Sequence, residues 1–382
     1  MDRTRIGRAF LALCGPRWEE TASLSQDDWT GLAEMAAQHR LAPFLHGRVM
    51  RGEIAGVPPV IARTWQEAHR RNAILALSQR SALLRVVEQL ATETIGTVAL
   101  KGAALAWTVW PSPAERTMRD IDILVPAEDA ARAYEVLQAA GWQAPELLPA
   151  DREAFARDEI HFPLLHSREG VMCELHARLW AETQGTTMPL SCEDHMLANA
   201  RYEERLGAAV PAAEDMLVHL IVHAAFSHGL NTGPMTLVDI DLLCMRKRID
   251  WPAFWERADA AGFARAAALL FALVDRWRRP RFIKETACPI AVESGALDEM
   301  ELLLVQDLDE RKDVGALAAL SAGRISGRFD QHPLDRAEGK ASLAGRVGQL
   351  AARARSLAGS ALSRDTRHAA MATGRLRKWI EG

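Results

Sequence analysis

Hydrophobic residues recur at helical spacing over most of the first 95 residues. Two stretches, 18–50 and 60–93, carry this period, and Gly56-Val-Pro-Pro separates them. Ser25 stands where a helix N-cap is expected. In the second stretch the period predicts one long helix with several large side chains on its buried side, namely Trp65, Ile74, Leu77, Leu83, Leu84, Val87 and Leu90. The pattern therefore predicts a helical region over 1–95.

Short apolar runs replace the helical period between residues 96 and 180. Val98-Ala99-Leu100 ends abruptly at Lys101-Gly102, and a helical segment of small residues follows. A second run spans 120–125, and the helix expected after it closes at Gly141, a typical C-terminal glycine. Runs at 161–165 and 171–176 flank Ser167-Arg-Glu-Gly170, which indicates a hairpin. The pattern predicts an α/β core over 96–180.

Two aspartates lie inside the run Asp120-Ile-Asp-Ile-Leu-Val. Residues i and i+2 of a strand point to the same face, so Asp120 and Asp122 project together while the isoleucines enter the core. By the same alternation, Glu174 and His176 share a face of the 171–176 run. Adjacent carboxylates repel each other unless a hard divalent cation such as Mg²⁺ neutralises them. The alternative is a pair of solvated aspartates at a strand end.

Helical spacing returns after residue 180 and continues to about residue 330. The segment 331–382 is rich in Ala, Gly, Ser and Arg. Its helical spacing over 343–361 allows a basic amphipathic helix that contacts RNA or a membrane surface, or else a final helix packed on the domain. The expected fold class is therefore α+β, with a small mixed sheet flanked by N-terminal and C-terminal helical subdomains.

The segment 97–125 resembles the minimal core of the polymerase-β-like nucleotidyltransferase superfamily. In that core a strand and a glycine turn open a helix, an Asp-x-Asp strand follows, and a third carboxylate lies on a later strand. The closer resemblance is to a bacterial family of largely uncharacterised nucleotidyltransferases. The matching residues are Lys101-Gly102, Arg116-Thr-Met-Arg-Asp-Ile-Asp-Ile-Leu-Val125 and Glu174-Leu-His176. Less specifically, the resemblance extends over about residues 25–290.

This resemblance implies a role for each matching residue. Asp120, Asp122 and Glu174 would be the catalytic and metal-binding carboxylates for Mg²⁺ or Mn²⁺, and Glu174 would also serve as base. A further set would bind the nucleotide or acceptor, namely Lys101, Gly102, Arg116 and His176, with Arg119 as a second candidate arginine. Many relatives have Gly-Ser at the glycine turn, whereas Ala103 follows Gly102 here. Lys101 is therefore expected to take over part of the serine's role.

The implied reaction transfers an NMP from an NTP, ATP among them, to an acceptor and releases pyrophosphate. The acceptor classes left open are tRNA, a protein or peptide, and a small molecule. Two alternatives are a nucleotide-binding, non-catalytic or toxin–antitoxin-type module and a phosphotransferase that uses the same metal site. His219 and His223 lack the glutamate of H-E-x-x-H, and the P-loop, dinucleotide-binding and hydrolase-elbow motifs are absent.

Composition and net charge bear on the partners and the cellular location of the protein. A net charge of −4 argues against a general nucleic-acid coat protein. The five cysteines are scattered and lack C-x-x-C spacing, which is typical of reduced thiols in the cytoplasm. We see no signal-type apolar core at the N-terminus and no apolar stretch long enough to span a bilayer. A cytoplasmic location is therefore expected.

Overall fold

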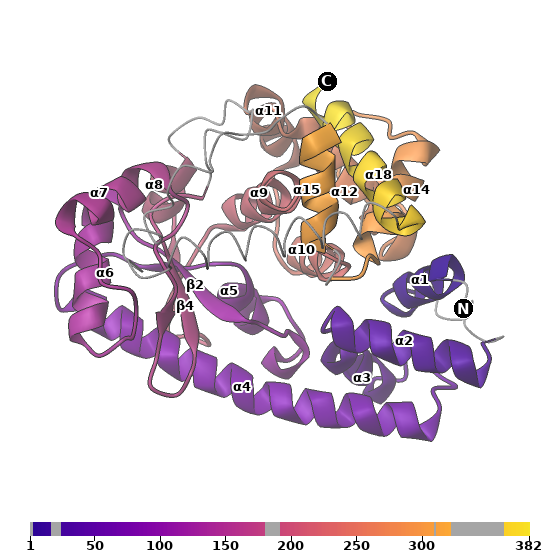
Figure 1. The fold of residues 1–382 in the computed structure, drawn as a ribbon, viewed down its shortest axis with the longest axis horizontal. Coiled ribbons are helices and arrows are strands. Elements are labelled where there is room, and N and C mark those ends of the chain that lie inside the picture. The colour runs from indigo at the N-terminus through magenta and orange to yellow at the C-terminus, as the bar shows by residue number, and fades with distance from the viewer. Residues whose placement is uncertain (1–2, 17–23, 180–191, 309–310, 322–362) are drawn as a thin grey trace, which may run out of the picture.

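The computed structural model describes residues 3–16, 24–179, 192–308, 311–321 and 363–382 (Figure 1). Over these residues the protein is mainly helical, with one small mixed sheet, so the α+β expectation is confirmed at that level. No helix in the described ranges has both the length and the apolar character that a bilayer crossing requires. The expected helical spacing over 343–361 lies outside the described residues.

Four helices precede the sheet: α1 (Arg3–Leu13), α2 (Gln26–Gln38), α3 (Ala42–Met50) and α4 (Pro59–Ala91). Ser25 caps α2 through a capping box, since its hydroxyl accepts from the Asp28 N–H and the Asp28 side chain accepts from the Ser25 N–H. The long helix α4 runs along the lower edge of the molecule in Figure 1. The predicted cap and the predicted long helix are both confirmed.

The prediction of the buried face of α4 is only partly correct. Trp65, Leu83 and Leu90 are buried, but Ile74 and Leu77 are 72% and 61% exposed. Two polar residues of α4 are buried instead, since the amide of Asn72 donates to the Ala114 carbonyl (2.8 Å) and that of Gln79 to the Met118 carbonyl (3.2 Å). These hydrogen bonds satisfy backbone carbonyl groups of the loop that leads into the second strand. The face of α4 that carries Asn72 and Gln79 is therefore turned towards this loop.

The four-stranded sheet has the order β1-β2-β4-β3. Its strands are β1 (Val98–Ala99), β2 (Asp120–Leu124), β3 (Leu165–His166) and β4 (Met172–His176). Only β2 and β4 are parallel to each other; β1 and β3 pair antiparallel at the two edges. Gly170 has φ +80° in the turn between β3 and β4, as the predicted hairpin requires. The expected strand–turn–helix unit also forms, because α5 (Lys101–Thr108) begins directly after β1.

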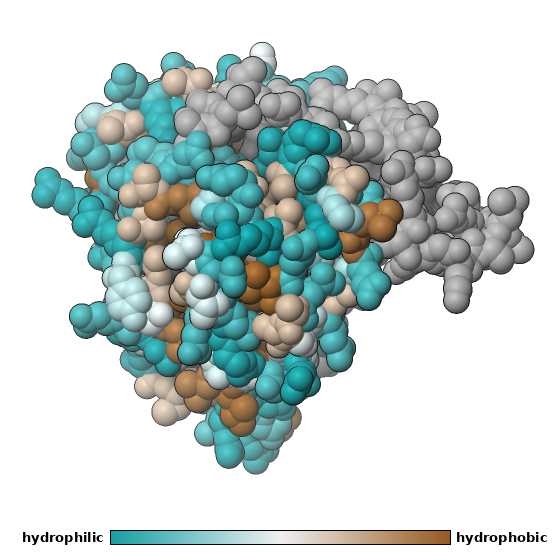
Figure 2. All heavy atoms as spheres, turned by 90° about the vertical axis from the view of Figure 1, so that its left-hand side faces the viewer, coloured by the Kyte–Doolittle hydropathy of each residue, from teal (hydrophilic) through white to brown (hydrophobic). Residues whose placement is uncertain are grey.

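One face of the sheet is covered by α4 and α6, and the other carries polar side chains. Helix α6 (Ala130–Ala139) ends before Gly141, whose φ is +95°. Ile121, Ile123, Cys173 and Leu175 enter the core formed with these helices. Figure 2 shows the end of the molecule that lies on the left of Figure 1, where hydrophobic residues occur in small groups among hydrophilic ones. This end includes α7 (Pro149–Asp158).

The remaining helices form a second layer at the upper right of Figure 1. They follow α8 (Cys192–Ala198) and the hairpin of β5 (Arg201–Glu203) and β6 (Ala208–Val210), and are α9 (Ala213–Val222), α10 (Met235–Arg246), α11 (Trp251–Ala260), α12 (Ala264–Trp277), α13 (Phe282–Glu285), α14 (Ser294–Leu304), α15 (Arg311–Ser321) and α18 (Arg364–Glu381). Their core is continuous with that of α1–α3, so the N-terminal and C-terminal helices pack as one cluster. The predicted division at residues 95, 180 and 330 remains a prediction.

Candidate functional site

Parallel pairing of β2 with β4 brings three predicted site residues together. Asp122 lies opposite Glu174 in the register, and Leu124 lies opposite His176. Alternation places Asp120 and Asp122 on one face of β2, with Glu174 and His176 on the same face of β4. Ile121 and Ile123, which alternate with the aspartates, are buried in the core, as the sequence pattern predicted.

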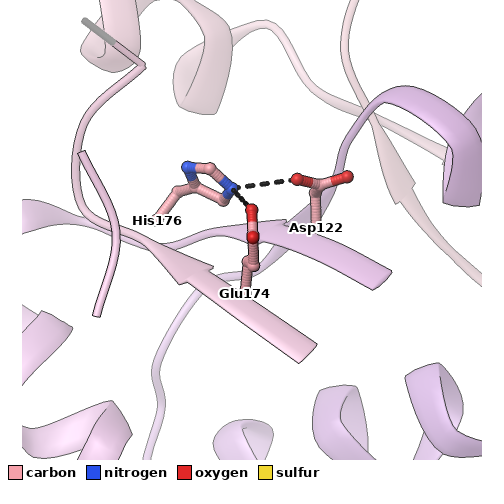
Figure 3. A group of neighbouring side chains, drawn as sticks. All are labelled: Asp122, Glu174 and His176. Carbon is pink, nitrogen blue, oxygen red and sulfur yellow. Dashed lines mark hydrogen bonds and ion pairs between the residues drawn. The ribbon is translucent and has the colours of Figure 1, made fainter. Parts of the chain in front are cut away.

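A buried hydrogen-bonded cluster forms where the two strands meet (Figure 3). The Nε2 of His176 lies 3.0 Å from Asp122 Oδ1 and 3.5 Å from Glu174 Oε2. The ammonium of Lys101 donates to the same Asp122 oxygen at 2.7 Å. Asp122 and His176 are only 5% and 2% exposed. Because water is largely excluded, each of these charges interacts strongly with its neighbours.

Contacts within the cluster shift the pKa values of its members. Burial alone would raise the pKa of Asp122, but the Lys101 charge and the His176 hydrogen bond hold it well below its usual value. For Glu174, burial is likewise outweighed, chiefly by its hydrogen bond with His176, and its pKa is lowered. Burial would lower the pKa of His176, but hydrogen bonds to the two carboxylates raise it. Lys101 and His176 thus lower the pKa of Asp122, and His176 lowers that of Glu174.

The pKa of Asp120 shifts in the opposite direction to that of the other two carboxylates. Burial and the neighbouring charges of Asp122 and Glu174 raise its pKa to about 6. A carboxyl group that resists ionisation beside two ionised ones marks a place with excess negative charge, and such excess is typical of functional sites. A bound cation would relieve it.

Replacing Asp120 is expected to stabilise the protein in the absence of metal. A pKa raised from 3.8 to about 6 means that the ionised side chain disfavours the fold above pH 6, and that this penalty disappears as the pH falls towards 4. In EDTA, Asp120→Asn should therefore increase the free energy of unfolding at pH 7 by on the order of 1 kcal/mol, with a smaller gain at pH 4.5. Chemical denaturation at the two pH values measures this, and an equal or lower stability at pH 7 would refute it.

The turn between β1 and α5 is tightly built. Lys101 has φ +39°, an uncommon backbone conformation for a residue with a side chain. Gly102 is buried, and a Cβ added to it would lie 2.7 Å from Cγ of Met118. Packing of Met118 against this turn thus explains the glycine. Binding of phosphate by Lys101 and Gly102 stays a prediction.

Arg116, predicted to contact the nucleotide, is bound elsewhere in the protein. Its Nε and Nη2 donate to the two carboxylate oxygens of Asp239 on α10, at 2.9 and 2.8 Å. The indole N–H of Trp110 donates to the same aspartate at 2.8 Å. Arg116 therefore fixes the loop that leads into β2 onto the second layer of helices.

His219 on α9, His223 in the π-helical turn that follows (His223–Ser227), and His228 directly after that turn are within range of the charges of Lys101 and Asp122. Burial lowers the pKa of His219, His223 and His228, and Lys101 is the next cause in each case. Nε2 of His223 and of His228 are 3.1 Å apart, and neither ring nitrogen of His219 has a partner. In the described ranges the group of potential metal ligands consists of Asp122, Glu174 and His176, and these three histidines are not part of it.

The donor set suits a divalent cation. One potential ligand atom from each of Asp122, Glu174 and His176 lies within 4.8 Å of the others. Carboxylate oxygens suit Mg²⁺ and Mn²⁺, and an imidazole nitrogen is acceptable to Mn²⁺ and softer ions. The excess negative charge at Asp120 supports the same conclusion.

Residues beyond the sequence predictions also surround this site. Burial lowers the pKa of His228, and the charge of Arg311, the first residue of α15, acts in the same direction. Burial also lowers the pKa of Arg40, and the charge of Asp120 opposes this shift. No local pattern pointed to either arginine, because each approaches the site only through tertiary packing. The i, i+4 spacing of His219 and His223 is visible in the sequence, but it lacks the glutamate of the H-E-x-x-H zinc motif.

The chain was compared with known families and with curated proteins. The model of a family described as uncharacterised nucleotidyltransferase matches residues 25–279, which is more than half of the chain. No curated protein matches the chain. The matched range includes β2, β4 and α9, and therefore all the candidate carboxylates. The chain belongs to this uncharacterised nucleotidyltransferase family.

Proposed function

We propose that this protein transfers an NMP group from an NTP to a hydroxyl group of an acceptor and releases pyrophosphate. The observation that carries the proposal is the pairing of Asp122 with Glu174 across β2 and β4, with Asp120 and His176 on the same face. Family membership gives the reaction class, since nucleotidyl transfer is what the family's description names.

In this proposal Asp120, Asp122 and Glu174 hold Mg²⁺ or Mn²⁺. Such an ion, when bound, would neutralise charge on the reacting phosphate and on the leaving pyrophosphate. His176 orients Asp122 and Glu174, since its Nε2 lies within reach of both. Lys101 balances the charge of Asp122 and lies at the start of α5, where a helix N-terminus favours anions.

The acceptor oxygen attacks the α-phosphorus, a new oxygen–phosphorus bond forms, and the bond to the bridging oxygen of the β-phosphate breaks. The hydroxyl proton passes to a carboxylate, and Glu174 is our candidate because it lies opposite Asp122 on the neighbouring strand. Arg116 has an indirect role in this proposal, because its ion pair with Asp239 fixes the loop that leads into β2.

The test is transfer of label from NTP to an unidentified acceptor. Purified protein is incubated with Mg²⁺, fractions of cell lysate and each NTP, labelled with ³²P at the α-position or at the γ-position. We expect α-label in one fraction of RNA, protein or small molecules, and no such label in EDTA. Transfer of γ-label alone would instead establish a phosphotransferase, and nucleotide binding without any transfer would establish a binding module.

A further inference from the structure

The ammonium group of Lys101 lies inside the carboxylate site. Its Nζ is 2.7 Å from Oδ1 of Asp122, and the two side chains are 14% and 7% exposed, so the ion pair is largely shielded from water. Nε2 of His176 lies 3.0 Å from the same oxygen. The other carboxylate oxygen of Asp122 makes no hydrogen bond or ion pair with the residues that the structure describes. One oxygen of Asp122 is thus bound to a cation of the protein itself, and the second oxygen remains available.

The backbone holds Lys101 at this position. The N–H of Leu100 donates to the carbonyl of Asp122 at 2.9 Å, which joins the turn directly to the residue that Lys101 pairs with. Lys101 has φ +39°, and Met118 packs closely against the following residue, Gly102. Such an uncommon backbone conformation costs free energy and persists only where the surrounding structure imposes it. The turn is therefore fixed beside Asp122, and the Lys101 ammonium is a built-in part of the site.

The ion pair bears on the phosphate contact that the sequence led us to expect from Lys101. A phosphate would have to draw the ammonium away from a carboxylate oxygen at 2.7 Å, and Asp122 would then keep a buried charge without its partner. The geometry therefore favours a role for Lys101 at the carboxylates over a role at the phosphates.

The formal charges of the site match one divalent cation together with the Lys101 ammonium. Asp120, Asp122 and Glu174 carry three negative charges when they are ionised. His176 adds no charge as a metal ligand, because an imidazole must be neutral to bind a metal. One divalent cation and one ammonium supply three positive charges. A second divalent cation would leave an excess of positive charge in the nucleotide-free site, which is costly where water is largely excluded.

We propose that the Lys101 ammonium takes the place of a second divalent cation, so that the three carboxylates hold a single ion. The inference rests on the proposed function. Sites that use two metal ions place them about 3.5–4 Å apart and thereby stabilise both the attacking and the leaving oxygen. An ammonium 2.7 Å from Asp122 occupies space beside the carboxylates that such a second ion would need. Lys101 is then a positioning residue, because it acts through Asp122.

The test counts the Mn²⁺ ions that the whole chain binds in the absence of nucleotide. Wild type, Lys101→Met and Lys101→Arg are titrated with Mn²⁺, and the free ion is measured by electron paramagnetic resonance. Each protein is also titrated with Asp122→Asn added, and the ions lost in that derivative are those of this site. We expect one such ion in the wild type and in Lys101→Arg, and two in Lys101→Met. Lys247→Met is the matched control and should bind one, since Lys247 is exposed after α10.

Thermal melting gives a readout of a different kind. Lys101→Met leaves the buried Asp122 carboxylate without its ammonium partner, so the metal-free variant should melt at a lower temperature than the wild type. Mn²⁺ should raise the melting temperature of Lys101→Met more than that of the wild type, because an additional ion replaces the missing charge. An equal shift in the two proteins would make Lys101 a structural residue only and overturn the proposal. Should Lys101→Met not fold, Lys101→Gln, whose amide can still donate to Asp122, is titrated with the same expectation of two ions.

Three ion counts would also overturn the proposal. They are two ions at this site in the wild type, one ion of unchanged affinity in Lys101→Met, and one ion bound more tightly in Lys101→Met. The last result would mean that Lys101 competes with the single ion and does not replace a second one. Failure of the proposed function looks different, since label transfer would then be absent while the expected ion counts still held.

Discussion

Asp122→Asn is expected to reduce nucleotidyl transfer by about 10³-fold or more. Asp122 is the central carboxylate of the site, with Lys101 at 2.7 Å and His176 at 3.0 Å from one oxygen. Asparagine keeps the shape of the side chain but removes the charge that would hold a divalent cation. Loss of metal-based stabilisation of several kcal/mol corresponds to this factor in rate. The initial rate of α-label transfer measures the effect.

The matched control for this variant is Asp259→Asn, because Asp259 is exposed on α11, away from the sheet. It should transfer label at the wild-type rate. Circular dichroism would establish that Asp122→Asn is folded, which separates lost chemistry from lost structure. Full activity in Asp122→Asn would exclude a catalytic role for the carboxylate pair on β2 and β4.

Asp239→Ala is expected to lower the free energy of unfolding by about 3–5 kcal/mol. Asp239 is 2% exposed and accepts hydrogen bonds from Arg116 and Trp110. Its removal leaves a largely buried guanidinium group and an indole N–H without partners, and an isolated buried charge is far more costly than a paired one. Chemical denaturation followed by circular dichroism measures the change.

The control for this prediction is Asp259→Ala, which should change the stability by no more than about 0.5 kcal/mol. The double variant Arg116→Met/Asp239→Leu should recover part of the loss, because it removes both charges from the interior together. If Asp239→Ala were as stable as Asp259→Ala, the ion pair between the β2 loop and α10 would have no stabilising role.

The strand faces on which the candidate site residues lie were predictable because strand alternation is local. Asp120, Asp122, Glu174 and His176 lie on the faces that a period of two requires. The pairing of Asp122 with Glu174 was not contained in that period. It depends on the parallel contact of two strands far apart in the sequence, and the expectation of a third carboxylate came from the family resemblance.

Other features required tertiary structure. Ile74 and Leu77 appeared suited to the buried face of α4, but the loop carbonyls of Ala114 and Met118 require hydrogen-bond donors there, and the helix turns Asn72 and Gln79 towards them. Likewise, the pairing of Arg116 with Asp239 joins residues that no short motif connects. The limits of prediction from sequence thus lie where polar groups find distant partners.

The most direct test of the central claim is Mn²⁺ binding, followed by electron paramagnetic resonance in the wild type, Asp122→Asn and Glu174→Gln. This measurement needs neither the acceptor nor the preferred nucleotide. If these carboxylates hold the catalytic cation, the wild type binds Mn²⁺ and each variant binds at least about tenfold more weakly. Equal Mn²⁺ affinity in all three proteins, or no binding to the wild type in the presence of NTP, would contradict the claim.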